Sequence, residues 1–198
     1  YRGPDYRRQL NDLRELLTQE NIPLRLYSGA EVFADPSNIR TLIEQHELIT
    51  LGGSRYLLVE FDFGLPGSVL LRTLEAIAQR GLVPVVAHPE RYDAVQRDPG
   101  LAAWCFSRGM LLQLNKGSLL GLLGSRAEGT ALHLLSHGLA HLIASDAHDD
   151  RFRTTGFRSL LPVLEPICHP DYIALLLHGN PRRILRDEPI PIPPLQSD

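Results

Sequence analysis

Cysteine and long apolar runs are both scarce in this sequence. Cys105 and Cys168 are the only two cysteines among 198 residues and lie far apart, which argues against a disulfide scaffold and favours a reducing compartment. No apolar run reaches the roughly 18 to 20 residues that a membrane-spanning helix needs, and no basic-then-apolar leader opens the chain. We therefore expect a cytoplasmic protein without membrane insertion.

Positive charge shows no excess. Lysine and arginine total 20 against 23 acidic residues, the formal net charge is −3, and the pI is near 6.3. Such a chain has no general attraction for nucleic acid, although a local basic pocket still suits a single phosphate. With 43% hydrophobic residues the chain can bury a sizeable core. We expect residues 1–188 to form one domain and residues 189–198 a proline-rich, extended tail.

Short apolar stretches alternate with amphipathic ones along the chain. Leucines at helical spacing predict a helix over residues 6–20, and the next stretch predicts a strand over residues 23–29. Gly81, Gly109 and Gly138 end later helices, where a left-handed residue is favoured. Strands that are apolar almost throughout are typical of a parallel sheet, so the fold class is α/β with about five strands. Further strands are predicted over residues 55–61, 82–88, 110–115 and 140–146, and further helices over residues 67–81, 99–109 and 125–138.

Polar and charged side chains gather at the carboxyl ends of the predicted strands. In parallel α/β folds the loops at these ends converge on one site. Carboxylates and imidazoles together suit Mn²⁺, Fe²⁺ or Zn²⁺, and two ions about 3.5 to 4 Å apart can clamp a phosphoryl group and generate hydroxide. The pattern predicts a metal-dependent phosphatase site. Its candidate residues are Glu31, Glu60, His88, Glu90, Arg91, Asn115, Asp146 and His148.

Each candidate also has a purely structural interpretation. Asp146 and Asp149 could cap a helix, His88 could be a hydrogen-bonded core histidine, and Glu31 could be an exposed loop acid. Glu60 is harder to explain in this way, because a carboxylate within an apolar strand usually needs a charged or metallic partner. Their shared position at successive strand ends favours a site. Histidines away from these ends are assigned no role: His46, His133, His137, His141, His169 and His178.

Four motifs, "SGAEV", "VEF", "AHPERY" and "SDAH", resemble in their order the later motifs of the PHP (polymerase and histidinol phosphatase) superfamily. "AHPERY" followed by "QLNKGSL" is most similar to bacterial tyrosine-protein phosphatases of the CpsB/YwqE type, which belong to capsular and exopolysaccharide biosynthesis systems. The resemblance extends from the start of the chain to "NPRRIL". It implies a PHP-type distorted (β/α)₇-like barrel and a metal-dependent protein-tyrosine phosphatase.

The family begins with an H-x-H strand and a further histidine ahead of a segment like "YRGPDY", and the sequence opens at that segment. We therefore expect an N-terminally incomplete barrel that lacks its first strands. A two-metal clamp needs both positions filled, so residues 1–198 alone are expected to bind at most about one ion well and to be weak or inactive.

Residue by residue, the resemblance implies two groups of metal ligands. Glu31 resembles a carboxylate that bridges two ions, and Glu60 and His88 complete one metal position. Asp146 and His148 match ligands of the other positions. The expected metal is Mn²⁺, with Fe²⁺, Zn²⁺ and Mg²⁺ as alternatives, and the complete protein is expected to hold two or three ions.

The resemblance also implies the residues that bind substrate. Arg91 and Arg153 match arginines that hold the phosphate, whose oxygens suit a planar guanidinium. Asn115 is expected beside them, and Lys116 stands where the family often has a small residue. The implied substrate is a phosphotyrosine protein, with a bacterial tyrosine kinase as a candidate partner and homo-oligomerisation left open.

Two other functions remain open. One is a different PHP phosphoesterase acting on histidinol phosphate or a nucleotide, and the other is a metal-poor binding or regulatory module without turnover. A cysteine nucleophile is not expected, because neither Cys105 nor Cys168 lies in a C-x-x-x-x-x-R motif.

Overall fold

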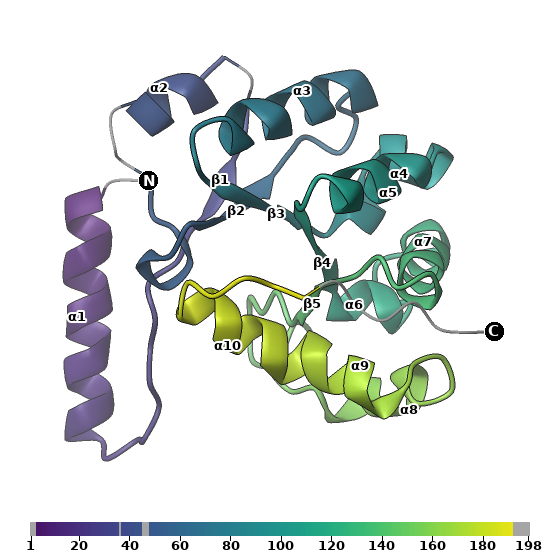
Figure 1. Ribbon diagram of the computed structural model, residues 1–198. Coiled ribbons are helices and arrows are strands. Elements are labelled where there is room, and N and C mark those ends of the chain that lie inside the picture. Colours follow the sequence, from purple (N-terminus) through teal and green to yellow (C-terminus); the bar gives the residue numbers. More distant parts are fainter. Residues whose placement is uncertain (1–2, 36, 45–47, 192–198) are drawn as a thin grey trace.

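A five-stranded parallel sheet forms the centre of the computed structural model, which describes residues 3–35, 37–44 and 48–191 (Figure 1). Its strands are β1 (Glu31–Phe33), β2 (Tyr56–Glu60), β3 (Val83–Ala87), β4 (Leu111–Asn115) and β5 (Leu142–Ala144). The α-helices are α1 (Gly3–Gln19), α2 (Ile39–Glu44), α3 (Gly67–Ala78), α4 (Asp93–Arg97), α5 (Gly100–Ser107), α6 (Lys116–Leu119), α7 (Ser125–Ser136), α8 (Leu161–Leu164), α9 (Pro170–Ala174) and α10 (Asn180–Leu185).

The strands lie in chain order, β1-β2-β3-β4-β5, and each pairs in parallel with the next. The predicted α/β class with about five parallel strands is confirmed. A sheet wound in one direction is the arrangement that a (β/α) barrel uses. Because β1 and β5 are the edges of the described sheet, a closed, distorted (β/α)₇-like barrel remains a prediction.

Alternate residues of the strands enter two separate cores, as the two-residue period of a strand requires. Leu57, Val86 and Leu112 belong to the larger core together with side chains of α3, α5 and α7. Val85 belongs to the smaller core, which also contains Ile184 from α10. The sheet is therefore covered on both faces, which explains why its strands read as nearly continuous apolar runs.

The segment after α10 is tied to the beginning of β2. Asp187 forms an ion pair of 2.9 Å with Arg55, and the Tyr56 hydroxyl donates a hydrogen bond of 2.7 Å to the carbonyl of Glu188. The domain limit at residue 188 stays a prediction. The predicted tail over residues 189–198 lies mostly outside the described residues, as does His46.

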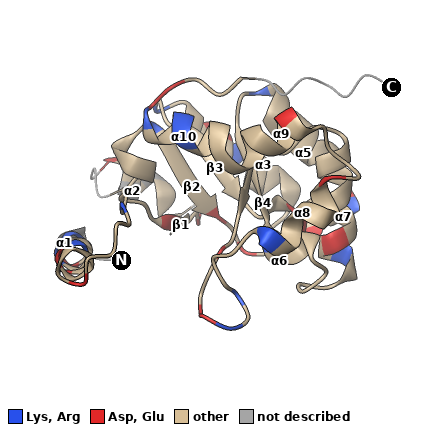
Figure 2. Ribbon diagram, turned by 90° about the horizontal axis from the view of Figure 1, so that it is seen from below, with Lys and Arg blue, Asp and Glu red and all other residues tan. Residues whose placement is uncertain are grey.

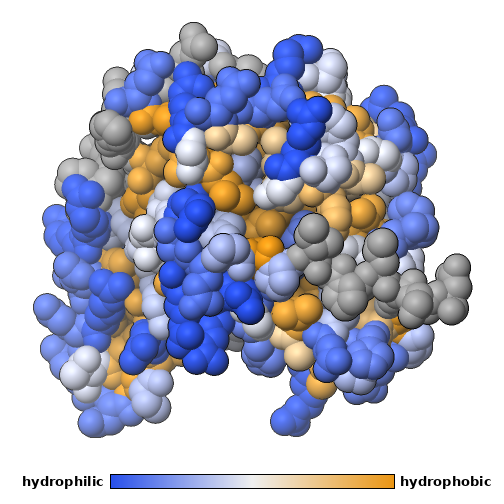
Figure 3. All heavy atoms as spheres, viewed as in Figure 1, coloured by the Kyte–Doolittle hydropathy of each residue, from blue (hydrophilic) through white to orange (hydrophobic). Residues whose placement is uncertain are grey.

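Helix α1 confirms the helix predicted over residues 6–20 and lies at one side of the sheet (Figure 1). The guanidinium of Arg14 donates to the carbonyl of Leu26 at 2.9 Å. Leu13 and Leu16 of this helix are about half exposed, and Figure 3 shows hydrophobic side chains between hydrophilic ones on that side. Within the described ranges, no helix combines the length and apolarity that crossing a membrane requires.

The strand predicted over residues 23–29 is wrong. The first strand is Glu31–Phe33, where Val32 is buried and pairs with Val59 of β2. Alternating hydrophobicity alone does not make a strand, which also needs a hydrogen-bonded neighbour. Leu24, in the predicted segment, is 60% exposed and outside any described strand.

The other predicted strands and helices are confirmed with shifted limits. Gly81, Gly109 and Gly138 have φ angles of 81°, 72° and 66°, as expected of left-handed helix ends. The short helices α2, α4, α6, α8, α9 and α10 were not predicted. Their four to six residues are too few to show a helical period in the sequence.

Candidate metal centre

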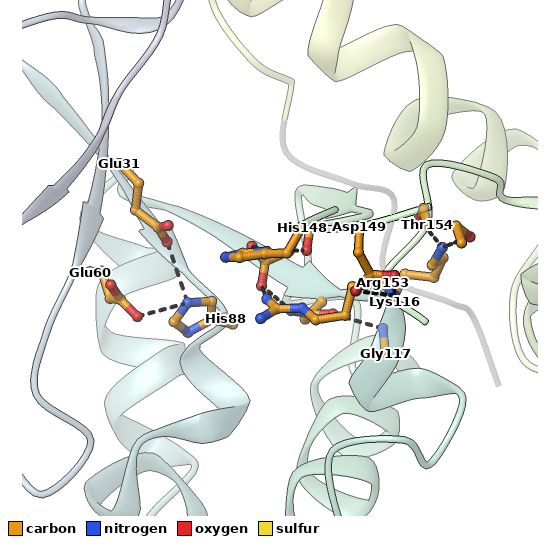
Figure 4. A network of polar contacts seen from close by, with 11 residues as sticks. Glu31, Glu60, His88, Lys116, Gly117, His148, Asp149, Arg153 and Thr154 are labelled. Atoms are coloured by element: carbon orange, nitrogen blue, oxygen red, sulfur yellow. Dashed lines mark hydrogen bonds and ion pairs between the residues drawn. The ribbon is translucent and has the colours of Figure 1, made fainter. Parts of the chain in front are cut away.

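Three predicted ligands, Glu31, Glu60 and His88, lie together at one edge of the sheet (Figure 4). The Nε2 atom of His88 is 3.3 Å from Oε1 of Glu31 and 3.3 Å from Oε1 of Glu60. Atoms that bind one ion at about 2.0 to 2.2 Å are separated by about 3.0 to 3.5 Å. Because the three donor atoms lie within 4.8 Å of one another, they fit one shared cation.

The three ligands come from neighbouring strands. Glu60 is the last residue of β2, and His88 follows the last residue of β3. Glu31 is the first residue of β1, so the expectation that it follows its strand is wrong, because the strand begins later than predicted. In the register of the sheet Glu31 pairs with Leu58, which lies two residues before Glu60 in β2. In Figure 2, acidic segments lie along the sheet edge near β1.

Two predicted ligands have left-handed backbones. His88 has a φ angle of 32° and Asp146 one of 46°, a region that residues other than glycine rarely adopt. Each residue comes shortly after a strand, β3 or β5. Such a conformation costs about 1 to 3 kcal/mol and is typical of functional sites. It turns the chain sharply, and Pro89 then begins a helical turn.

The two carboxylates differ in proton affinity. The hydrogen bond with His88 lowers the pKa of Glu31. Burial, together with the neighbouring charge of Glu31, raises the pKa of Glu60. Two acids beside a single imidazole leave excess negative charge in a partly buried place, which a divalent cation would neutralise.

A second group of predicted residues surrounds Asp146. Its Oδ2 accepts hydrogen bonds from the side-chain amide of Asn115 at 2.6 Å and from the guanidinium of Arg153. The Nδ1 atom of His148 lies 2.9 Å from the carbonyl of Asp146. Because a carbonyl only accepts, Nδ1 must donate, which leaves Nε2 of His148 free to bind a metal.

The two groups face each other, as Figure 4 shows. The charges of His148 and Arg153 contribute to lowering the pKa of Glu31, and the charge of Asp146 contributes to raising that of Glu60. Among the described residues, however, the tight donor cluster consists of Glu31, Glu60 and His88 without Asp146 or His148.

Arg91 lies on the His88 side of the site. Its guanidinium carbon is 4.3 Å from the ring centroid of Phe63, whose ring is 5.8 Å from that of His88. Its charge opposes the rise that burial causes in the pKa of Glu60. Arg91 and Arg153 thus approach the site from the segments after β3 and β5. Sequence reasoning missed Phe63. The only signal was an aromatic residue three positions after Glu60.

Asn115 is held by three hydrogen bonds. Its backbone N–H donates to the buried carboxylate of Glu90 at 3.0 Å, and its side-chain oxygen accepts from the N–H of Gly117 at 2.7 Å. The third is the bond to Asp146. Burial raises the pKa of Glu90, which was a candidate residue of the site without a specific role. The expected contact of Asn115 with substrate stays a prediction.

The loop after Asp146 is closed by its own polar groups. The Asp149 carboxylate accepts from the N–H groups of Arg151 and Phe152 at 2.8 and 2.5 Å. Asp149 therefore shapes a loop and does not cap a helix, since the next helical turn begins at Arg158. The buried Lys116 donates from Nζ to carbonyls of Thr154 and Gly156, the latter at 2.9 Å.

The cysteines take no part in this site. Cys105 and Cys168 are both buried, and burial raises their pKa values to about 12 and about 11. A thiol with such a pKa is almost entirely protonated at neutral pH and is a poor nucleophile.

A parallel α/β sheet with carboxylates, imidazoles and arginines at one edge defines an α/β protein with a candidate metal site. Residues 3–186 match the family described as capsular polysaccharide synthesis, CpsB/CapC, and this chain belongs to that family. The resemblance proposed from the motifs is thereby confirmed.

Named relatives agree with the family match. The tyrosine-protein phosphatase YwqE of Bacillus subtilis (strain 168) is 28% identical over 184 residues, which are 93% of this chain and 72% of that protein. The tyrosine-protein phosphatase CpsB of Streptococcus pneumoniae is 27% identical over 181 residues, covering 89% and 74% of the two chains.

A solved structure is also similar. It belongs to a study of YwqE from Bacillus subtilis and CpsB from Streptococcus pneumoniae, described there as unique metal-dependent tyrosine phosphatases. It matches with a TM-score of 0.87 and 27% sequence identity, and the match covers 100% of this chain and 79% of that chain.

Proposed function

We propose that this protein is a metal-dependent protein-tyrosine phosphatase that acts in capsular or exopolysaccharide biosynthesis. The observation that carries the proposal is the position of His88 Nε2, 3.3 Å from a carboxylate oxygen of Glu31 and of Glu60. The charges of Arg91 and Arg153 are near enough to act on these carboxylates. Relatives named tyrosine-protein phosphatases and the capsular family support it.

In this proposal Glu31, Glu60 and His88 hold one metal ion, and Asp146 and His148 contribute to further positions. Divalent ions, when bound, supply a hydroxide nucleophile near neutral pH and offset phosphoryl charge. Oxygen and imidazole donors without thiolate suit Mn²⁺ best, with Fe²⁺, Zn²⁺ and Mg²⁺ as alternatives. Two or three ions are proposed for the site.

Arg91 and Arg153 are proposed to bind the phosphate oxygens. A guanidinium has five N–H donors in a plane, so Arg153 can keep its bond to Asp146 and still present donors to a phosphate. Asn115 completes this side of the site. The chain's groups thus orient the ester, while the buried thiols stay out of the reaction.

We propose a cytoplasmic protein whose substrate is a phosphotyrosine protein, with a bacterial tyrosine kinase as the candidate. In the described sheet β1 is an edge strand, and backbone groups of an edge strand can pair with another chain. Self-association to a homo-oligomer is therefore part of the proposal.

The decisive experiment measures hydrolysis by metal-free protein and by protein supplied with MnCl₂. Activity on 4-nitrophenyl phosphate and a phosphotyrosine peptide should require metal, be lost with EDTA and survive alkylation by iodoacetamide. Absence of activity in protein that has bound Mn²⁺ would refute the proposal and favour a non-catalytic module. Faster hydrolysis of histidinol phosphate or a nucleotide would indicate another phosphoesterase.

A further inference from the structure

A pocket of about 420 Å³ opens beside Arg153. One wall comes from the loop after α6, with Leu122 and Leu123, and the other from the loop after β5, with Phe152 and Arg153. In Figure 4, Arg153 lies between the His88 cluster and Lys116, which also lines this pocket. The pocket therefore adjoins the candidate phosphate site on the side away from the carboxylates.

The two walls carry apolar side chains that are unusually exposed. Phe152 is 81% and Leu122 is 65% exposed, the two largest values among the large hydrophobic side chains of the described residues. They do not stabilise the core, and each exposes apolar surface to water. A bound apolar group would bury this surface, which lowers the free energy. Exposed hydrophobic side chains lining one pocket are typical of a ligand-binding surface.

The backbone beneath these side chains is held in place. The N–H of Phe152 donates to the Asp149 carboxylate at 2.5 Å. Further along the same loop, the Lys116 ammonium donates hydrogen bonds to the carbonyls of Thr154 and Gly156. On the opposite wall, a Cβ atom added at Gly117 would lie 3.3 Å from Leu123, so these two residues are closely packed. The backbone that carries the exposed side chains is thus held in one conformation, and such preorganisation favours binding of a specific partner.

We propose that this pocket binds the aromatic ring of an aryl phosphate, with Leu122 and Phe152 on either side of the ring. The inference rests on the proposed phosphatase function and adds a residue-level basis for preferring tyrosine. With its phosphate at Arg153, an aryl ester extends a flat ring into the pocket. The short side chain of a serine or threonine phosphate leaves the pocket unfilled, so it forfeits the apolar contacts.

Binding of two non-hydrolysable phosphonates tests the proposal. Isothermal titration of Mn²⁺-loaded protein should show phenylphosphonate binding about tenfold more tightly than methylphosphonate. Leu122→Ala and Phe152→Ala should each reduce this preference to about twofold while methylphosphonate affinity stays unchanged. Leu24→Ala, which truncates a leucine of similar exposure outside the pocket, is the matched control and should behave as wild type. Melting temperatures verify that all variants fold.

The outcomes separate this inference from the proposed function. If methylphosphonate binds and phosphatase activity is present, but the phenyl preference is absent or survives both pocket substitutions, the ring lies elsewhere and the inference is overturned. An unchanged phenyl preference combined with a raised KM for a phosphotyrosine peptide would assign the pocket to a neighbouring substrate residue and also overturn it. If neither phosphonate binds and no ester is hydrolysed, both proposals fail.

Discussion

The side-chain amide of Asn115 donates a hydrogen bond of 2.6 Å to the carboxylate of Asp146. The bond joins the end of β4 to the turn after β5 and fixes the direction of a predicted metal ligand. Because the side-chain oxygen of Asn115 accepts a hydrogen bond from the N–H of Gly117, the amide cannot rotate freely. Asn115 is thus placed to orient Asp146 as well as to approach substrate.

Asn115→Ala should weaken metal binding. Loss of a residue that orients a ligand typically reduces metal affinity about 10- to 100-fold. Asn115→Asp should be worse, since a second carboxylate would face Asp146 without a donor between them. Metal titration monitored by isothermal calorimetry measures the effect. Equal affinity in wild type and Asn115→Ala would show that Asp146 is oriented by other contacts.

His88→Ala and Arg91→Ala should have different effects. Removing the imidazole takes away a ligand and should lower metal affinity by at least about 100-fold, with a parallel loss of activity. Removing the guanidinium should leave metal content unchanged and raise KM about tenfold or more, because a charge-assisted bond to phosphate is lost. Elemental analysis and steady-state kinetics distinguish the two. The same metal content in His88→Ala and wild type would exclude His88 as a ligand.

The sequence predicted the features that depend on local patterns. Apolar runs located four of the five strands, and the carboxylates and imidazoles after the predicted strands identified Glu31, Glu60 and His88, which the structure brings together. For Glu31 this succeeded although its strand was misplaced. The position of β1 was missed because strand pairing with β2 decides it. The roles of Asn115 and Lys116 were also inaccessible, because their partners are 31 to 40 residues away in the chain and meet only through the fold.

Lys116→Met should release the loop that carries Arg153. Lys116 is 4% exposed and donates to two loop carbonyls, so methionine fills its space but leaves these acceptors without their donor. We expect a loss of about 1 to 3 kcal/mol in the free energy of unfolding and faster tryptic cleavage at Arg151 and Arg153.

Lys116→Arg is the control for this prediction, because it keeps the charge and the donors and should retain most of the protection of the loop. Urea denaturation and timed proteolysis provide the measurements. Identical cleavage rates for Lys116→Met and wild type would mean that the Asp149 hydrogen bonds alone hold the loop.

His141 directly precedes β5 and was assigned no catalytic role, yet its side chain is buried, with 4% exposed. Its Nδ1 accepts a hydrogen bond of 3.1 Å from the N–H of Leu112, so the bonded nitrogen must be unprotonated. Burial lowers the pKa of His141 to about 4, whereas an exposed imidazole titrates near 6.5. The folded state therefore excludes a proton that the unfolded chain accepts.

This difference fixes the sign of a pH effect. Above pH 6.5 both states are neutral at His141 and stability is unaffected. As the pH falls from 6.5 towards 4, only the unfolded chain gains the proton, so the free energy of unfolding should decrease by up to about 1.4 kcal/mol per pH unit.

His141→Asn, whose side-chain oxygen can accept from Leu112, should remove this contribution. Urea denaturation of both metal-free proteins between pH 7 and 4 measures it, with the difference between the profiles cancelling the opposite contributions of Glu60 and Glu90. Parallel profiles would show that folding does not lower the pKa of His141.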